Sequence, residues 1–302
     1  MKDSYLSLFR APGSHRRLSF AGEREGNELL NGKLLADGEE VGRISDGIIS
    51  LVEADPWPRD LLEEIRSSQQ ISRNWENSIE QAHTNLDRRD ICDDLAAVKG
   101  AILEVAVGPG GGNMPPVLSR NPEAMLIVND ISEGVLKLWR DFLAERKMGR
   151  SLCFAAFDAR NMPIRSESIS AVSNLCGFGN IDRGHEAIQE AVRVLEPGGE
   201  LFSVEFVVDP DGWVRIPEEV RKEYDEHHPI FTRGSEELLR QAGLSVESRK
   251  LLPGRKLVPE QDEVAQVAAK YGVTLYASFE YVRARKIWVV TLLSNVYIKG
   301  RR

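Results

Sequence analysis

The sequence predicts an α/β protein with a doubly wound, mostly parallel seven-stranded sheet and a small β-rich appendage at its N-terminus. After Gly100, short apolar runs alternate with amphipathic helical segments, which is typical of repeated βα units. Before residue 56, alternating apolar and polar stretches are joined by Asp37-Gly38 and Asp46-Gly47, dipeptides that favour tight turns between strands.

We expect three parts, namely a β-rich module over 1–55, helices over 56–98 that lead into the main domain, and the main domain over 99–302. The run Asp55-Pro-Trp-Pro marks the first boundary, because each proline disfavours a helical conformation in the residue before it. Beyond residue 59, apolar residues recur at spacings of three or four, which predicts two helices before Val98.

The main domain follows a regular order of strands and helices. We expect strands at 101–107, 125–129, 152–157, 169–175, 200–207, 244–252 and 286–296. Crossover helices are expected at 135–147, 184–195 and 235–242. An insertion over 253–285, with a helix at about 260–271, separates the last two strands and is a candidate dimer contact.

Composition limits the partners of the protein. A net charge of −8 with dispersed Lys and Arg makes nucleic acid a weaker expectation than a small molecule. Three scattered cysteines form no CxxC pair, which predicts a reducing, cytoplasmic location and no metal site. No apolar run is long enough to span a membrane.

A glycine-rich turn carries the strongest functional signal. The first expected strand ends at Val107 and is followed by glycines at 108, 110, 111 and 112, so a ligand can lie against the bare main chain. Glu104 lies within the apolar strand, where a carboxylate needs a partner. Asp130 closes the next strand, where an acid accepts hydrogen bonds from ribose hydroxyls. A dehydrogenase would need a third glycine where this chain has Asn113.

These residues resemble the first motif of the class I S-adenosylmethionine-dependent methyltransferases, in which an acid precedes three alternate glycines. The chain reads Glu104-x-Ala106-x-Gly108-x-Gly110, with Ala106 at the first glycine position. The run Asp158-Ala-Arg-Asn-Met-Pro is similar to the adenine-binding segment of the family, and Arg193-Val-Leu-Glu-Pro-Gly-Gly resembles the turn before its fifth strand. The segments Phe178-Gly-Asn-Ile and Ser203-Val-Glu-Phe are similar to the corresponding segments of ubiquinone and menaquinone C-methyltransferases.

The resemblance implies S-adenosylmethionine as cofactor and an enzyme that methylates a small molecule. Asp130 would bind the ribose, and Asp158 and the peptide N–H of Ala159 would bind the adenine. The expected cofactor-binding residues are Glu104, Ala106, Gly108, Gly110, Asp130, Ile131, Asp158, Ala159 and Asn174.

The methyl acceptor is expected beside the loop after the fourth strand, with Cys176 and Phe178 in the pocket wall. No catalytic base is evident, and His185, His227 and His228 are the candidates. Two alternatives stay open, namely an RNA or protein methyltransferase and a non-catalytic, cofactor-binding partner subunit. Residues 31–35 and 42–51 also resemble part of the zinc-ribbon-like modules found beside some methyltransferases, without the cysteines of those modules.

Overall fold

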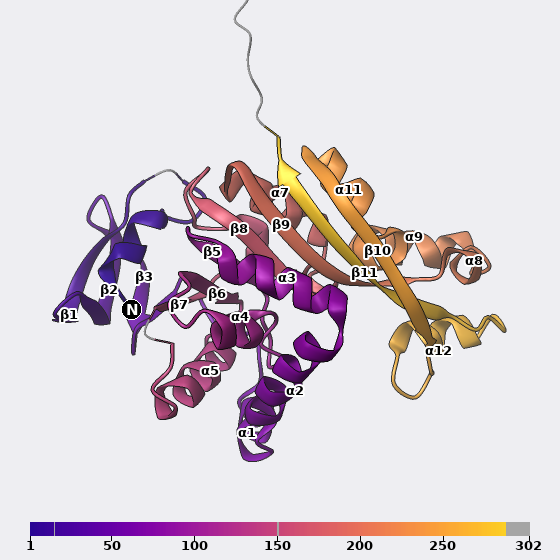
Figure 1. The fold of residues 1–302 in the computed structure, drawn as a ribbon, viewed down its shortest axis with the longest axis horizontal. Coiled ribbons are helices and arrows are strands. Elements are labelled where there is room, and N and C mark those ends of the chain that lie inside the picture. Colours follow the sequence, from indigo (N-terminus) through magenta and orange to yellow (C-terminus); the bar gives the residue numbers. More distant parts are fainter. Residues whose placement is uncertain (15, 150, 288–302) are drawn as a thin grey trace, which may run out of the picture.

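The computed structural model describes residues 1–14, 16–149 and 151–287 (Figure 1). Within these residues one sheet carries eleven strands in the order β1-β2-β3-β4-β7-β6-β5-β8-β9-β11-β10. The run from β7 to β9 is parallel, and β11 and β10 continue it in antiparallel pairing. The predicted mostly parallel, seven-stranded arrangement is therefore confirmed from β7 to β10, as part of a larger sheet.

The strands of this region lie close to their predicted places. They are β5 (Ile102–Val105), β6 (Leu126–Asp130), β7 (Leu152–Ala156), β8 (Ile169–Leu175), β9 (Leu195–Val208), β10 (Leu244–Lys256) and β11 (Tyr276–Lys286). The expected strand at 286–296 lies, apart from its first two residues, outside the described residues. Strand β11 lies within the expected insertion and was not predicted, because the buried Glu280 and the ion-paired Arg283 and Arg285 interrupt the apolar pattern of the strand.

The N-terminal strands extend the main sheet. They are β1 (Ser19–Glu25), β2 (Glu28–Ala36), β3 (Glu39–Ser45) and β4 (Ile48–Ser50), and the two predicted turns at Asp37-Gly38 and Asp46-Gly47 join β2 to β3 and β3 to β4. All four turn residues have a positive φ, as such turns require. Strand β4 is fully buried and pairs in parallel with β7, so this part of the chain shares a core with the rest. The zinc-ribbon likeness stays a prediction.

Three helices, not two, lead into the main domain. They are α1 (Arg59–Ser67), α2 (Gln70–Thr84) and α3 (Leu86–Ala97). The first break lies at Gln69, which has a left-handed φ of 54°. The second lies at Asn85, whose side chain accepts the N–H groups of Asp87 and Arg88 at 3.0 and 3.1 Å and so begins a new helix. The apolar spacing runs across both breaks and therefore does not reveal them.

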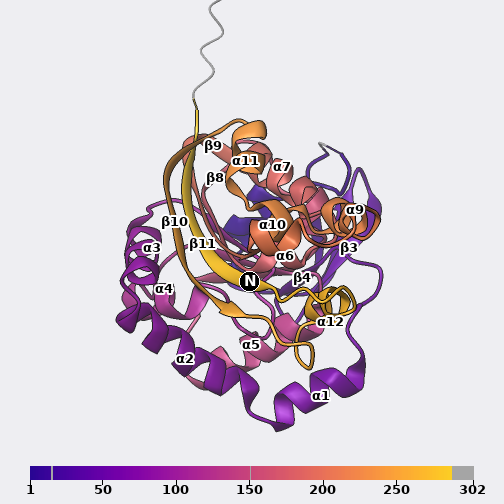
Figure 2. The same cartoon turned by 90° about the vertical axis from the view of Figure 1, so that its right-hand side faces the viewer.

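Helices cover both faces of the sheet (Figure 2). Helices α1 to α3 pack with α4 (Met114–Arg120) and α5 (Glu133–Glu145) in one apolar core. The opposite face holds α6 (Gly177–Asn180), α7 (Gly184–Val194), α10 (Pro229–Arg233) and α11 (Glu236–Gln241) in a second core. This is the doubly wound arrangement, which leaves the carboxyl ends of the parallel strands open between the two layers.

A third, smaller core lies beyond the end of β9. It joins α8 (Pro210–Trp213) and α9 (Glu218–His227) to α12 (Glu263–Ala269) and the loops around it. The helix expected at 260–271 is therefore found. In the part of the chain that the structure describes, no helix combines the length and apolar character needed to cross a bilayer.

Candidate functional site

The glycine turn lies at the carboxyl end of β5. Ala106 and Gly108 both have a left-handed φ, of 51° and 52°. This conformation costs an alanine about 1–2 kcal/mol, which explains why the related motif has glycine at the Ala106 position. The peptide N–H of Gly108 donates to Asp130 Oδ2 at 2.8 Å, and its carbonyl accepts from Trp139 Nε1 at 2.9 Å. The turn is therefore fixed from both neighbouring elements.

Glu104 lies beneath this turn and is 1% exposed. Its Oε1 accepts the N–H of Asn113 at 2.8 Å, which is the backbone donor that a buried carboxylate needs. Burial raises the pKa of Glu104 to about 7, against the opposing effects of hydrogen bonds from Ser173 and Asn113. A Cβ on Gly112 would lie 2.0 Å from Oε1. Glu104 therefore supports the turn from below and requires glycine above it.

Helices α2 and α3 hold the outer side of the turn. Asn74 Nδ2 donates to the carbonyl of Pro109 at 2.9 Å. Ser78 Oγ and Arg88 Nη2 donate to the carbonyl of Gly112 at 3.3 and 3.0 Å. The sequence does not single out these three residues, because a polar side chain on an amphipathic helix is usually solvated. The break at Asn85 turns α3 so that Arg88 is 4% exposed.

Asp130 ends β6 and is 5% exposed. Its second oxygen, Oδ1, accepts the N–H of Ser132 at 2.9 Å. Burial raises the pKa of Asp130, while the N–H groups of Ser132 and Gly108 act in the opposite direction. The carboxylate is thus fixed in one orientation beside the glycine turn.

A cleft of about 680 Å³ opens above the turn and brings most of the predicted site residues together. The predicted residues that line it are Ala106, Gly108, Gly110, Asp130, Ile131, Asp158, Ala159 and Cys176. A Cβ built on Gly108 or Gly110 would find its nearest neighbour only at 3.9 or 4.0 Å. The main chain therefore faces open space, as a site for a closely bound ligand requires.

Trp57 also lines this cleft. The linker that carries it is anchored by Asp55, whose Oδ2 accepts from Ser132 Oγ at 3.1 Å and from the N–H of Gly134 at 2.7 Å. Asp55 thereby binds the first turn of α5 and holds Trp57 at the cleft wall. The sequence predicted the linker but not this contact.

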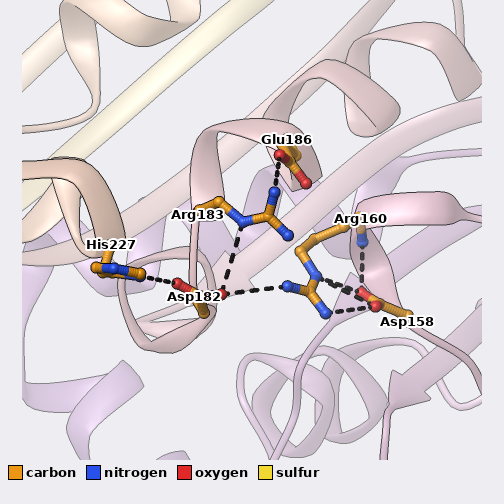
Figure 3. A network of polar contacts seen from close by, with 6 residues as sticks. All are labelled: Asp158, Arg160, Asp182, Arg183, Glu186 and His227. Carbon is orange, nitrogen blue, oxygen red and sulfur yellow. Dashed lines mark hydrogen bonds and ion pairs between the residues drawn. The ribbon is translucent and has the colours of Figure 1, made fainter.

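Asp158 begins a polar network that runs along the rim of the cleft (Figure 3). Its Oδ2 accepts from Arg160 Nη2 at 2.8 Å, and Arg160 Nη1 lies 3.4 Å from Asp182, which in turn lies 2.7 Å from His227 Nδ1. Burial raises the pKa of Asp158, but the bonds from Arg160 outweigh this effect and hold it below its usual value. Asp158 is therefore an anion at neutral pH.

Besides the candidate histidines, three predicted site residues lie outside the cleft wall. Glu104 and Asn174 are buried beneath it, so their contact with a cofactor stays a prediction. Asn174 Oδ1 accepts the N–H groups of Gly177 and Phe178 at 2.5 and 3.0 Å and so shapes the loop after β8. Phe178, expected in the acceptor pocket, is fully buried in the main core instead, because this short turn directs its ring inward.

A second cavity, of about 510 Å³, adjoins the first, and both are lined by Cys176 and Asn180. Four aromatic side chains form its wall, namely Phe206, Tyr224, Phe231 and Phe279. Arg255 closes one side, with its guanidinium 5.4 Å from the ring centre of Phe206 and 2.9 Å from Asp262. The cavity is thus an aromatic chamber at the end of the cleft.

The three candidate histidines have different surroundings. His228 lines the second cavity. His227 is exposed, and its hydrogen bond to Asp182 raises its pKa. His185 lies in α7 and lines neither cavity. Cys176 is no ready nucleophile, because burial raises the pKa of its thiol to about 12.

Glu205, on β9, was not among the predicted site residues. It is 1% exposed and yet lines the second cavity. The signal that could have identified it is an acid within an apolar strand, which is the pattern that drew attention to Glu104. Among the residues that the structure describes, no cluster of three His, Cys, Asp or Glu side chains could hold a metal ion.

Comparisons with known proteins agree with this geometry. Residues 105–203 match the family model of a methyltransferase domain. A ubiquinone/menaquinone biosynthesis C-methyltransferase (UbiE) of Pseudomonas entomophila is 30% identical over 115 residues, which are 37% of this chain and 45% of the relative. The chain therefore spans about half the length of the curated relatives that it matches.

Solved structures extend the likeness to about two thirds of the chain. A Bacillus halodurans protein described as a methyltransferase is 22% identical, with a TM-score of 0.50 over 66% of this chain and 98% of that chain. The YcgJ protein of Bacillus subtilis is 12% identical, with a TM-score of 0.50 over 66% and 97%. The predicted Rossmann-like fold is confirmed.

Proposed function

We propose that this chain, whose residues 105–203 form a class I S-adenosylmethionine-dependent methyltransferase domain, is an enzyme that methylates a small, flat, apolar molecule. One observation carries the proposal. A cleft built on a bare glycine turn and a fixed carboxylate leads at Cys176 into an aromatic chamber. This geometry provides one place for a nucleoside and a separate, adjoining place for an acceptor.

The residues of the cleft fit the cofactor. Gly108 and Gly110 leave the space that a bound molecule would fill, and Asp130 presents a fixed acceptor for two ribose hydroxyls. Asp158 and the peptide N–H of Ala159 would meet the adenine, with Ile131 against its ring. When bound, the cofactor supplies a methyl group on a sulfonium, which is already a good leaving group.

The protein would then contribute mainly orientation and a dry environment. Well-oriented reactants gain up to about 7–11 kcal/mol over reactants free in solution. The aromatic wall of the second cavity excludes water from one side of the acceptor. The loop at Cys176, held by Asn174, sets where the two cavities meet.

The chemistry of the chamber favours a ring-shaped acceptor. Aromatic side chains bind planar rings by stacking and edge contacts. The matched relatives are named as C-methyltransferases of quinone biosynthesis, which supports methylation at a ring carbon here as well. A small-molecule acceptor also agrees with the net charge of −8, which disfavours binding to nucleic acid.

The test is release of S-adenosylhomocysteine from the full chain, given S-adenosylmethionine and a panel of phenols and hydroquinones, with fractionated cell extract as a further acceptor source. We expect turnover with at least one aromatic small molecule. Phe231→Ala should raise the KM for that molecule and leave the Kd of the cofactor unchanged, because Phe231 lines only the second cavity. Cofactor binding without product release from any source would instead indicate a non-catalytic subunit, and turnover only with RNA or protein would overturn the small-molecule proposal.

A further inference from the structure

We propose that Glu205 accepts the proton that the acceptor loses during methyl transfer, so that the acceptor is a phenol or hydroquinone with an acidic O–H or an activated ring C–H. This inference rests on the proposed function and extends it to the substrate class. It assigns a role to a buried carboxyl group that the cofactor site leaves unused.

The position of Glu205 is the first argument. Glu205 lies near the end of β9 and lines the second cavity together with Cys176 and Asn180. Those two residues also line the cofactor cleft. Glu205 thus belongs to the wall of the cavity that adjoins the proposed cofactor cleft, where a general base for methyl transfer would have to be.

The hydrogen bonds of the carboxyl group leave one oxygen available. Oε1 accepts from Asn174 Nδ2 and, at 3.4 Å, from Ser203 Oγ. Among the described residues, Oε2 accepts only the N–H of Gly179, at 3.1 Å. A carboxylate oxygen has two acceptor positions, so Oε2 retains one for a proton from a bound molecule.

The charged groups around Glu205 also agree with a role as a base. Within the described part of the chain, no ion pair includes Glu205. On β11 the directly opposite residue is Glu280, whose carboxylate bonds to Ser235 and Arg249 and lines neither cavity. From the other elements around the chamber, the titratable and charged side chains are Cys176, Tyr224, His228, Arg255, Asp262 and Glu263.

These surroundings match the carboxyl group to its task. Burial raises the pKa of Glu205 to about 7, against the hydrogen bonds from Asn174, Gly179 and Ser203, and Glu280 adds to the increase. A base is most effective when its pKa lies near the working pH. An ordinary exposed glutamate would be a much weaker base.

When oxygen is methylated, the O–H proton moves to Oε2 of Glu205 while an electron pair of that oxygen forms the bond to the methyl carbon. When a ring carbon is methylated, an electron pair of the ring forms that bond first, and the proton of the same ring carbon then moves to Oε2 while the C–H electron pair returns to the ring. The electron pair of the broken S–CH₃ bond stays on sulfur, which leaves the neutral thioether. The protonated Glu205 then returns its proton to water after the product leaves.

The experiment compares Glu205→Gln with Glu280→Gln, a matched control on the opposite strand. In the full chain with ¹³C-labelled glutamate, carboxyl resonances are titrated without any acceptor. We expect two signals with a pKa of about 7, one from Glu104 and one from Glu205. One of them should be missing in Glu205→Gln, and both should be present in Glu280→Gln, where the Glu205 signal should lie at a slightly lower pH because one neighbouring charge is gone.

With the phenol or hydroquinone that supports turnover, Glu205→Gln should lower kcat by about 100-fold or more and remove the rise of kcat with pH near 7. Its Kd for S-adenosylmethionine, measured by calorimetry, should equal that of the wild type, which also shows that the variant is folded. In His228→Ala, kcat should still rise with pH near 7.

A folded Glu205→Gln chain with kcat within tenfold of the wild type would overturn the inference. Loss of the pH dependence of kcat in His228→Ala alone would overturn it as well. If the wild type turns over no acceptor, the proposed function itself fails.

Discussion

Replacement of Asp130 by alanine tests the cofactor site most directly. The N–H of Gly108 donates to Asp130 Oδ2 at 2.8 Å, and the N–H of Ser132 donates to Oδ1 at 2.9 Å. These two hydrogen bonds keep the carboxylate from rotating away from a bound ribose. A hydrogen bond to a charged acceptor contributes about 1.5–3 kcal/mol. Because each 1.4 kcal/mol is a factor of about ten, loss of one ribose bond weakens binding about tenfold and loss of two about a hundredfold or more.

The assay is calorimetric titration of the purified full chain with S-adenosylmethionine. Asp130→Asn is the graded variant, because it keeps the side-chain volume and one oxygen acceptor, and it should lose less affinity than Asp130→Ala. Asp182→Asn is the control, since Asp182 lies on the same cleft but bonds to His227 at the rim. The reasoning is refuted if Asp130→Ala folds and binds the cofactor as tightly as the wild type.

Two further predictions concern the support of the glycine turn. Gly112→Ala should lower the free energy of unfolding by about 2–5 kcal/mol, because the new Cβ overpacks against Glu104 and the residue keeps a left-handed φ. Gly272 has a φ of 68°, and a Cβ there would meet no atom within 4 Å. Gly272→Ala should therefore show the cost of the left-handed φ alone. Equal thermal shifts in the two variants would contradict this. The pKa of Glu104 rises from 4.5 to about 7 on folding, so the native state binds more protons in that window and stability should fall as pH rises through it, by up to about 3 kcal/mol. Burial raises the pKa of Glu205 in the same window, so Glu104→Gln should reduce this dependence of stability on pH and not abolish it. Urea titrations at pH 5 and pH 8 measure the change, and an unchanged difference between the two pH values would argue against a buried, protonated Glu104.

The sequence was sufficient for features that depend on local pattern. The alternation of apolar strands and helices placed six strands of the parallel region and its antiparallel edge within a few residues. The glycine turn and Asp130 were found because their residue types are required by backbone geometry and by a polar ligand. Eight of the predicted site residues meet in one cleft for the same reason.

Long-range pairing was not accessible in the same way. Strand β4 has only three residues, and nothing in their order shows that they pair with β7, a hundred residues away. Strand β11 was not predicted, because its arginines are typical of a solvent-exposed segment and their ion pairs with Glu200 and Glu247 are seen only in the structure. Phe178 was assigned to a pocket wall on position alone, and the turn that Asn174 stabilises directs it into the core.

Glu104 and Glu205 show why a functional role needs the structure. Both are acids inside apolar strands, both are 1% exposed, and burial raises the pKa of each to about 7. Glu104 lies against Gly112 and does not line the cofactor cleft, so in this structure its carboxyl group holds the turn, and its contact with a cofactor stays a prediction. Glu205 has a cavity beside an oxygen with a free acceptor position. The same signal in the sequence therefore corresponds to a structural support in one strand and a candidate base in the other, and the difference is the open space beside the carboxyl group.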